Sequence, residues 1–142
     1  MDLTTFVDDL VYEPTQTDSP GLDLTVDSIS RLSGPGRVDF GGGELGDAET
    51  EPVDTEKRDP DDDYGWWNLT EGVYLVEYNE TLVAPEDVRF VLQTRREVRT
   101  RGAFHPTVHL TDGQSVGPVP LTVSEGGIKI KENARLSTLL SG

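Results

Sequence analysis

Short apolar runs separated by closely spaced glycines and prolines constrain the fold of this chain more than any other feature. Fifteen Gly and nine Pro fall among its 142 residues, and the runs between them are too short for long amphipathic helices. Leu22–Asp27 alternates apolar and polar side chains with the period of two that places Leu22, Leu24 and Val26 on one face of a strand. Many short strands at this spacing predict an all-β fold, a jelly-roll sandwich or barrel.

Further segments rich in β-branched and aromatic residues are predicted to be extended. They are Gly72–Tyr78, Val88–Leu92, Phe104–Leu110, Val119–Val123, Ile128–Ile130 and Leu136–Leu140. The Asp-Gly pair predicts a turn at Thr111–Gln114. We also expect a short helix over Thr4–Val11, which Pro14 would stop.

Residues 33 to 63 are dominated by Gly, Pro, Asp and Glu. We expect a single domain over residues 1–142, with a long, solvated acidic loop at about 41–65 that holds at most one short strand pair. Within this region only Val38–Phe40 has the composition of a strand. Trp66 and Trp67 follow the loop, and we expect them to anchor it to the body rather than to stack on a ligand.

The chain is strongly acidic, with 27 Asp and Glu against 12 Lys and Arg and a formal charge of −15. This balance disfavours binding to nucleic acids and to anionic membranes. Arg outnumbers Lys, and the pattern is typical of cytosolic proteins from cells that live in high salt. An acidic protein from a low-salt organism with a disordered loop is the open alternative.

The absence of Cys excludes disulfides and thiolate metal sites. Met1–Leu10 contains three Asp and lacks the basic and apolar regions of a secretory signal. No apolar run approaches the ~20 residues that span a bilayer. We therefore expect a cytoplasmic protein without nucleic-acid or membrane partners.

Three segments, in this order, resemble the dUTPase and dCTP deaminase superfamily. They are Ser19–Asp27, in which small residues precede Asp-Leu, then Leu69–Thr81, and the closing strand Ile130–Leu139. The resemblance covers nearly the whole chain except the acidic loop. It implies a distorted jelly-roll of the dUTPase type, a homotrimer with sites where subunits meet, a deoxyribonucleoside triphosphate substrate with dUTP favoured, and Mg²⁺ as cofactor.

The resemblance also implies a set of substrate-binding residues. Asp23 matches the family Asp that helps to organise the triphosphate and its metal. Where the family has a phosphate-binding Arg-Ser-Ser turn, this chain has Thr94-Arg95-Arg96-Glu97, and Arg99 matches the Arg that follows. The Thr94 hydroxyl and the guanidiniums of Arg95, Arg96 and Arg99 can bind phosphate oxygens. A solvated basic strand end that balances the acidic surface is the alternative.

The catalytic position is altered. The family has an Asp that activates water for attack on the α-phosphate, but an ungapped match puts Thr111 there and Gln114 at an aromatic position. A Thr hydroxyl cannot act as a base at neutral pH, whereas a shift of one residue brings Asp112 into the role. Asp112 is therefore the candidate base, and the alternative is that it is only the turn residue before Gly113.

Two functions remain open from these residues: hydrolysis of dUTP to dUMP and pyrophosphate, or a catalytically degenerate relative that binds nucleotide or a protein partner. Deamination of dCTP is less supported, because Thr122 lies near the place of the family's catalytic Glu. A β-sandwich unrelated to nucleotides is a third class. No protein metal site is predicted, because His105 and His109, expected on the polar face of one strand, would be about 13 Å apart.

Overall fold

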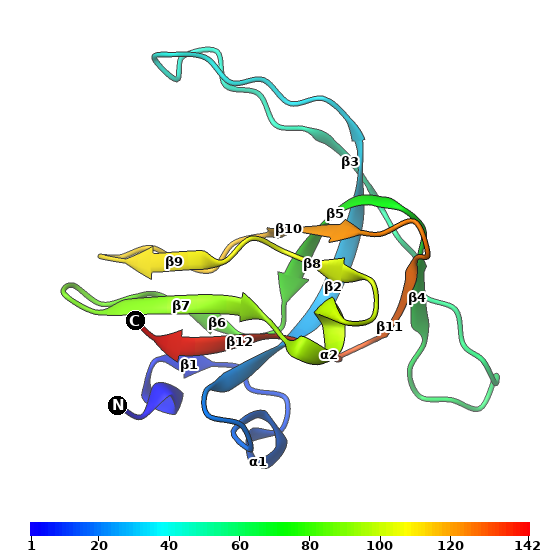
Figure 1. Ribbon diagram of the computed structural model, residues 1–142, viewed down its shortest axis with the longest axis horizontal. Coiled ribbons are helices and arrows are strands. Elements are labelled where there is room, and N and C mark those ends of the chain that lie inside the picture. Colours follow the sequence, from blue (N-terminus) through cyan, green and yellow to red (C-terminus); the bar gives the residue numbers. More distant parts are fainter.

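The computed structural model describes residues 1–142 and consists mostly of antiparallel strands (Figure 1). Its helices are the 3₁₀ helix η1 (Leu3–Thr5), α1 (Glu13–Gln16) and α2 (Arg96–Arg99). Its strands are β1 (Val7–Asp8), β2 (Leu22–Gly34), β3 (Glu49–Pro52), β4 (Trp66–Leu69), β5 (Gly72–Tyr78), β6 (Thr81–Leu82), β7 (Arg89–Thr94), β8 (Ala103–Phe104), β9 (Val108–Thr111), β10 (Val119–Val123), β11 (Ile128–Lys131) and β12 (Arg135–Ser141). The prediction of an all-β chain is confirmed.

The long strand β2 organises the main sheet, whose strands follow the order β8-β10-β5-β2-β12-β7-β9. The first part of β2 pairs with β12, and the part after Val26 pairs with β5 and then with β3. The pairing shifts register between Val26 and Ser28, and such a bulge bends and twists a strand. The main sheet therefore curls, and two small strand pairs, β1-β6 and β11-β4, lie beside it.

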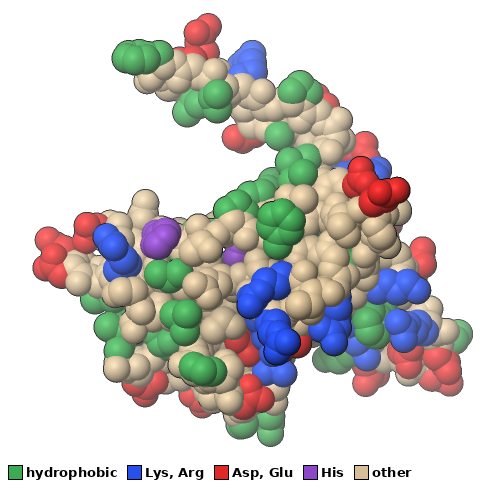
Figure 2. Space-filling view, in the orientation of Figure 1, with side chains coloured by type: hydrophobic (Ala, Val, Ile, Leu, Met, Phe, Trp, Pro, Cys, Tyr) green, Lys and Arg blue, Asp and Glu red, His purple; other side chains and the backbone are tan.

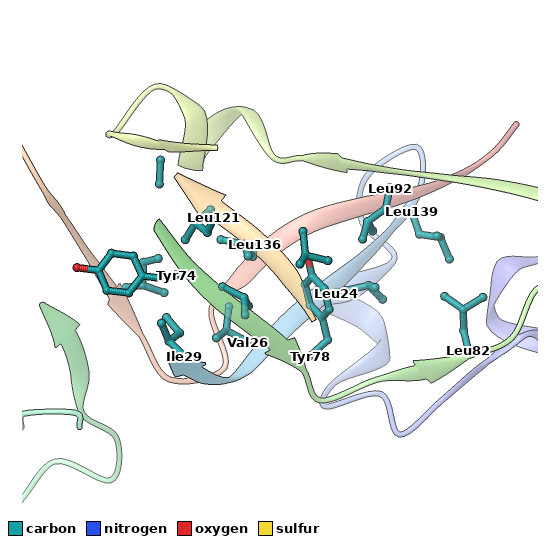
Figure 3. Close-up of a cluster of buried hydrophobic side chains, with 14 of the residues drawn as sticks. Leu24, Val26, Ile29, Tyr74, Tyr78, Leu82, Leu92, Leu121, Leu136 and Leu139 are labelled. Atoms are coloured by element: carbon teal, nitrogen blue, oxygen red, sulfur yellow. The ribbon is translucent and has the colours of Figure 1, made fainter. Parts of the chain in front are cut away.

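One continuous core of 22 buried apolar residues holds the strands together. Figure 3 shows Leu24 and Val26 of β2 beside Leu136 and Leu139 of β12, with Leu121 of β10 among them. These five side chains have exposed fractions of 1% or less. Burying such a side chain contributes roughly 1.5–3 kcal/mol, so this apolar interior is the main source of the fold's stability.

β2 differs from the half-buried strand that its alternation predicts. All five residues from Leu22 to Val26 are buried, including the polar Asp23 and Thr25. The second face is covered by the α1 segment, where the amide of Gln16 donates to the carbonyl of Asp23 at 2.8 Å. Thr25 donates from both its backbone N–H and its hydroxyl to the buried carboxylate of Glu80. Buried polar groups need such partners, and this face of β2 carries them.

The acidic segment also differs from the expected solvated loop. β2 continues to Gly34 and pairs with β3, and a further bridge joins Arg37 to Gly46. Residues 35–48 therefore form the end of a hairpin arm, which projects from the body in Figure 1. The expected short strand pair exists, but Val38–Phe40 does not belong to it. After β3, the Trp67 indole N–H donates to the Val53 carbonyl at 3.0 Å, which attaches the second half of the segment to the body.

The expected helix over Thr4–Val11 is wrong. Only Leu3–Thr5 is helical there, and Val7–Asp8 forms β1 against β6. Pro14 does not end a helix but begins α1, in the first-turn position where its missing N–H costs nothing. No helix in the structure has the length and hydrophobicity to cross a membrane.

Candidate functional site

Asp23 lies at the centre of a buried charge network. Its side chain has no exposed surface, and Oδ2 lies 3.1 Å from Nη1 of Arg135 and 3.5 Å from Nε of Arg95. The Thr138 hydroxyl donates to Oδ1 at 2.7 Å. A buried carboxylate is stable only when it is paired and hydrogen-bonded. Asp23 therefore holds two arginines of neighbouring strand ends in place, and it can influence a triphosphate only through them.

Thr94 ends β7 inside a second polar cluster. Its hydroxyl accepts from the backbone N–H of His105 at 2.9 Å and donates to the carbonyl of the same residue at 3.2 Å. The ring of His105 lies 2.7 Å from the Pro106 carbonyl through Nδ1 and 2.7 Å from the Ser137 hydroxyl through Nε2. The Ser137 hydroxyl in turn lies 2.6 Å from the Tyr78 hydroxyl.

The directions of these hydrogen bonds follow from the Pro106 carbonyl, which can only accept. Nδ1 of His105 therefore carries the proton, so Nε2 accepts from Ser137, and the oxygen of Ser137 accepts from Tyr78. Burial lowers the pKa of His105, and its bond to the Pro106 carbonyl opposes this shift only in part. Burial also raises the pKa of Tyr78. Both groups are neutral at pH 7, so the cluster fixes Thr94 without a charge.

Arginines gather where β7 leads into α2. Arg96 and Arg99 are exposed, while Arg95 is largely covered and its Nη2 lies 2.9 Å from Glu97. Arg99 donates to the Thr94 carbonyl at 3.0 Å. A hydrogen bond from its own backbone N–H and the charge of Arg95 lower the pKa of Glu97. Figure 2 shows Lys and Arg side chains gathered over α2 and its surroundings, while Asp and Glu side chains stand in separate patches elsewhere on this face.

An open hollow of about 650 Å³ lies beside this cluster. Its lining includes Thr94, Arg99 and Thr100 together with Phe104 and His105. The structure thus brings together four of the six predicted site residues, Asp23, Thr94, Arg95 and Arg99, and Arg96 begins the same short helix α2 that ends with Arg99. Guanidiniums and hydroxyls beside a concave surface can bind phosphate oxygens.

Asp112, the predicted base, lies at the other end of β7. Thr111 of β9 pairs with Arg89, the first residue of β7, whereas Thr94 is the last. Five residues of extended chain separate the two ends by roughly 16 Å. Asp112 has a left-handed φ of 42° and accepts from the Asp87 backbone N–H at 3.1 Å. Within one chain, Asp112 and the arginines therefore do not form a single site.

The surroundings of Asp112 are acidic. A shallow hollow there is lined by Glu86, Asp87 and Asp112, with no cation among its residues. The hollow at the Asp112 end of β7 is thus lined by carboxylates, whereas arginines gather at the Thr94 end. Opposite surfaces on copies of one chain favour their association.

Mg²⁺ is the cofactor that the family resemblance implies. The structure contains no group of three or more His, Asp or Glu side chains placed to hold a metal ion. Asp23, the predicted organiser of the metal, is fully buried against two arginines and a hydroxyl. Within one chain, both carboxylate oxygens of Asp23 are therefore already engaged by side chains of the protein.

Several residues of this region were not found from the sequence. Arg135 shares Asp23 with Arg95, and Ser137 and Tyr78 continue the polar cluster. The two histidines were expected on one polar face, but His105 is buried after β8 and His109 is exposed on β9. The available signal for Arg135 and Ser137 was that they are polar residues on either side of the apolar Leu136 in the predicted closing strand.

The chain is similar in sequence to several archaeal proteins, although no family model matches it. A probable deoxyuridine 5'-triphosphate nucleotidohydrolase of Archaeoglobus fulgidus is 32% identical over 134 residues, which cover 93% of this chain and 75% of the relative. A protein of the same description from Methanosarcina acetivorans is 30% identical over 128 residues, 89% of this chain and 71% of the relative. One from Halobacterium salinarum is 36% identical over 89 residues, 62% and 52% of the two chains.

The fold has a solved counterpart in a 2'-deoxycytidine 5'-triphosphate deaminase from Agrobacterium tumefaciens. The TM-score is 0.62 at 16% identity, and the match covers 96% of this chain and 43% of the other. At this identity the likeness concerns the fold alone, and it confirms the predicted dUTPase-like architecture. The sequence relatives and the shared fold together show that this chain belongs to the dUTPase and dCTP deaminase superfamily.

Proposed function

We propose that the chain hydrolyses a deoxyribonucleoside triphosphate, with dUTP as the favoured substrate, to the monophosphate and pyrophosphate. The observation that supports this most is the arginine cluster at the end of β7, because the buried Asp23 fixes Arg95 and thereby the start of α2. A chain with a net charge of −15 has little reason to concentrate cations at one place unless an anion binds there.

In this proposal the triphosphate lies across the hollow beside α2. Arg96 and Arg99 are the exposed guanidiniums and contact the phosphate oxygens, because guanidinium binds phosphate in a bidentate manner. Arg95 remains paired with Asp23 and Glu97, and it contributes charge and position. The Thr94 hydroxyl is occupied by His105, so Thr94 shapes the turn and does not contact the substrate.

In this proposal the catalytic carboxylate, that of Asp112, comes from a second copy of the chain. Asp112 lies roughly 16 Å along β7 from its own arginines, so the acidic hollow of one copy must face the basic hollow of another. The family resemblance implies a homotrimer. In a ring of three copies, the acidic hollow of each copy can face the basic hollow of the next, so that no hollow is left without a partner. We therefore propose a homotrimer in which each site combines arginines from one copy with Asp112 from a neighbour.

The chemistry at such a site is an in-line displacement. Asp112 accepts a proton from water as the water oxygen attacks the α-phosphorus. The bond from that phosphorus to the bridging oxygen breaks, pyrophosphate leaves with the bond electrons, and dUMP forms. Arg96 and Arg99 stabilise the charge that develops on the leaving group. Mg²⁺ enters with the triphosphate as part of the substrate, because Mg²⁺ commonly binds through phosphates and water.

A second candidate is a nucleotide-binding protein without catalysis. It is favoured by the position of Asp112, whose observed contact is that of a turn residue, and by Thr111 in the ungapped position. The arginine cluster would then bind the triphosphate while no base activates water. The two candidates share the binding site and differ only in turnover.

The acidic composition further supports a cytoplasmic, salt-adapted protein, since nucleotide triphosphates are cytoplasmic substrates and a carboxylate-rich surface suits molar salt. Assays therefore belong in molar KCl.

Two measurements test the proposed function. Pyrophosphate release is measured with dUTP and Mg²⁺, and calorimetric titration compares the binding of dUTP, dCTP and UTP. Turnover of dUTP supports the hydrolase, and binding without turnover supports the second candidate. Absence of binding by every nucleotide would contradict both.

A further inference from the structure

The hairpin arm carries apolar side chains where no element of the chain covers them. Phe40, Val38 and Leu45 are 110%, 89% and 61% exposed, which places Phe40 wholly in solvent. Figure 1 shows that the arm leads away from the body, and in Figure 2 apolar side chains stand at its end, beyond an empty concavity. Exposed apolar clusters of this kind mark interaction surfaces.

The same arm is acidic. Asp39, Glu44 and Asp47 lie between residues 35 and 48, and Arg37 is the single cation of this stretch. The net charge of these residues is therefore −2, from three carboxylates and one guanidinium. A partner for the arm must accept an aromatic ring and provide cations around it.

A second hollow of the body has these properties. It measures about 620 Å³ and lies between α2 and the β4-β11 pair. Its apolar lining includes Trp66, Leu69, Val98, Ile128, Ile130 and Leu136. The cations around it are Arg101, Lys129, Lys131 and Arg135, against the single carboxylate of Glu97. Its lining contains neither Arg96 nor Arg99, the two residues assigned above to phosphate contact.

We propose that the arm of one copy docks in this basic-rimmed apolar hollow of a second copy. The occupant is a second copy because both complementary surfaces lie on this chain, and because a cationic rim is rare on so acidic a protein. Phe40 enters the hollow, and the carboxylates beside it face Lys129 and Lys131. The contact joins two different surfaces, so it is head-to-tail and closes only in a ring.

This inference shares with the proposed function the premise that copies associate, but it does not require hydrolysis. The absence of Cys permits a direct cross-linking test. Gly43→Cys places one thiol on the arm, where an added side chain meets no atom within 4 Å, and Lys129→Cys places another on the rim. The two variants are mixed by joint refolding in molar KCl and treated with a short bis-maleimide.

A cross-linked dimer is expected from the mixture of the two variants. A mixture of Tyr12→Cys with Lys129→Cys is the control, because Tyr12 is also exposed, at 62%, but lies outside the arm. Adding Phe40→Ser to the arm variant should lower the dimer yield roughly tenfold, since the apolar anchor is lost, while adding Tyr12→Ser should leave it unchanged.

Two results would overturn the proposal: equal yields from the control mixture, or a dominant cross-link between two Gly43→Cys chains. If the cross-linked dimer forms in protein that releases no pyrophosphate, the result supports the arm contact and contradicts the proposed hydrolysis. Active protein without the cross-link contradicts the arm contact alone. The two proposals can therefore fail separately.

Discussion

The two ends of β7 differ in how their polar groups are held. At the Thr94 end, Thr94 bonds to His105, Arg95 pairs with the fully buried Asp23, and Arg99 donates to the Thr94 carbonyl. At the Arg89 end, Asp112 is held by a single bond from the Asp87 N–H in an exposed turn. The phosphate-binding end is thus built into the core, while the candidate base stands on the surface. Substitutions should therefore affect stability at one end and turnover at the other.

The largest expected effect is on turnover. Asp112→Asn should lower pyrophosphate release from dUTP by about 10²–10⁴-fold, because a positioned base contributes about this much. Affinity for dUTP should remain unchanged, since Asn keeps the oxygen that accepts from Asp87. Asp87→Asn, a neighbouring carboxylate of the same hollow, is the matched control. An unchanged rate would show that Asp112 is a turn residue only.

The next effect is on stability at the opposite end. Asp23→Asn keeps the size of the side chain but leaves Arg95 and Arg135 without their buried anion, so the free energy of unfolding should fall by about 3 kcal/mol. Asp18, the other partner of Arg135, has a side chain that is 55% exposed. Asp18→Asn should therefore lower the free energy of unfolding by less than about 1 kcal/mol. Denaturant unfolding at fixed KCl measures both. Equal losses would mean that the buried network does not organise this end.

A smaller effect is expected on affinity. Arg96→Gln and Arg99→Gln should each weaken dUTP binding about tenfold, because each loses a charge-assisted bond to phosphate. Arg31→Gln is the control, since Arg31 is exposed on β2 and bonds to Thr70. Calorimetric titration measures all three. If the control weakens binding as much, the cluster acts only through net charge.

The smallest effect is on pH dependence. Because the folded pKa of His105 lies below its ordinary value, the unfolded state binds the proton more readily. Stability should be complete above about pH 6.5 and should decline as the pH falls toward the lowered pKa. His105→Gln should remove this part of the slope, while His109→Gln, on the exposed histidine, should retain it. Unfolding at several pH values checks the difference.

The same contrast explains what the sequence could predict. The alternation of apolar and polar residues and the positions of turn residues located most strands, because both patterns are set by residues that are close in sequence. The buried face of β2 was missed because no period-two pattern shows that the chain just before β2 folds back over this face, or that the distant Glu80 binds Thr25 there. The arm was missed because its pairing, of β2 up to Gly34 with β3 and of Arg37 with Gly46, includes many residues with little preference for strands.

At the site, family motifs identified the residues, and long-range packing decided their surroundings. Asp23, Thr94, Arg95 and Arg99 converge as the motif order suggests. That Asp23 is buried, and that Asp112 lies at the far end of β7, depends on the pairing of β7 with β9 and β12. No local pattern contains that register.

The most direct measurement of the central claim mixes two variants that are each impaired in one half of the proposed site. Asp112→Asn chains and chains with both Arg96→Gln and Arg99→Gln are refolded together at equal amounts, and pyrophosphate release from dUTP is compared with each variant alone. If every site combines the arginines of one copy with the carboxylate of another, the mixture should recover about one quarter of the wild-type activity. A mixture no more active than its components would contradict a site shared between copies.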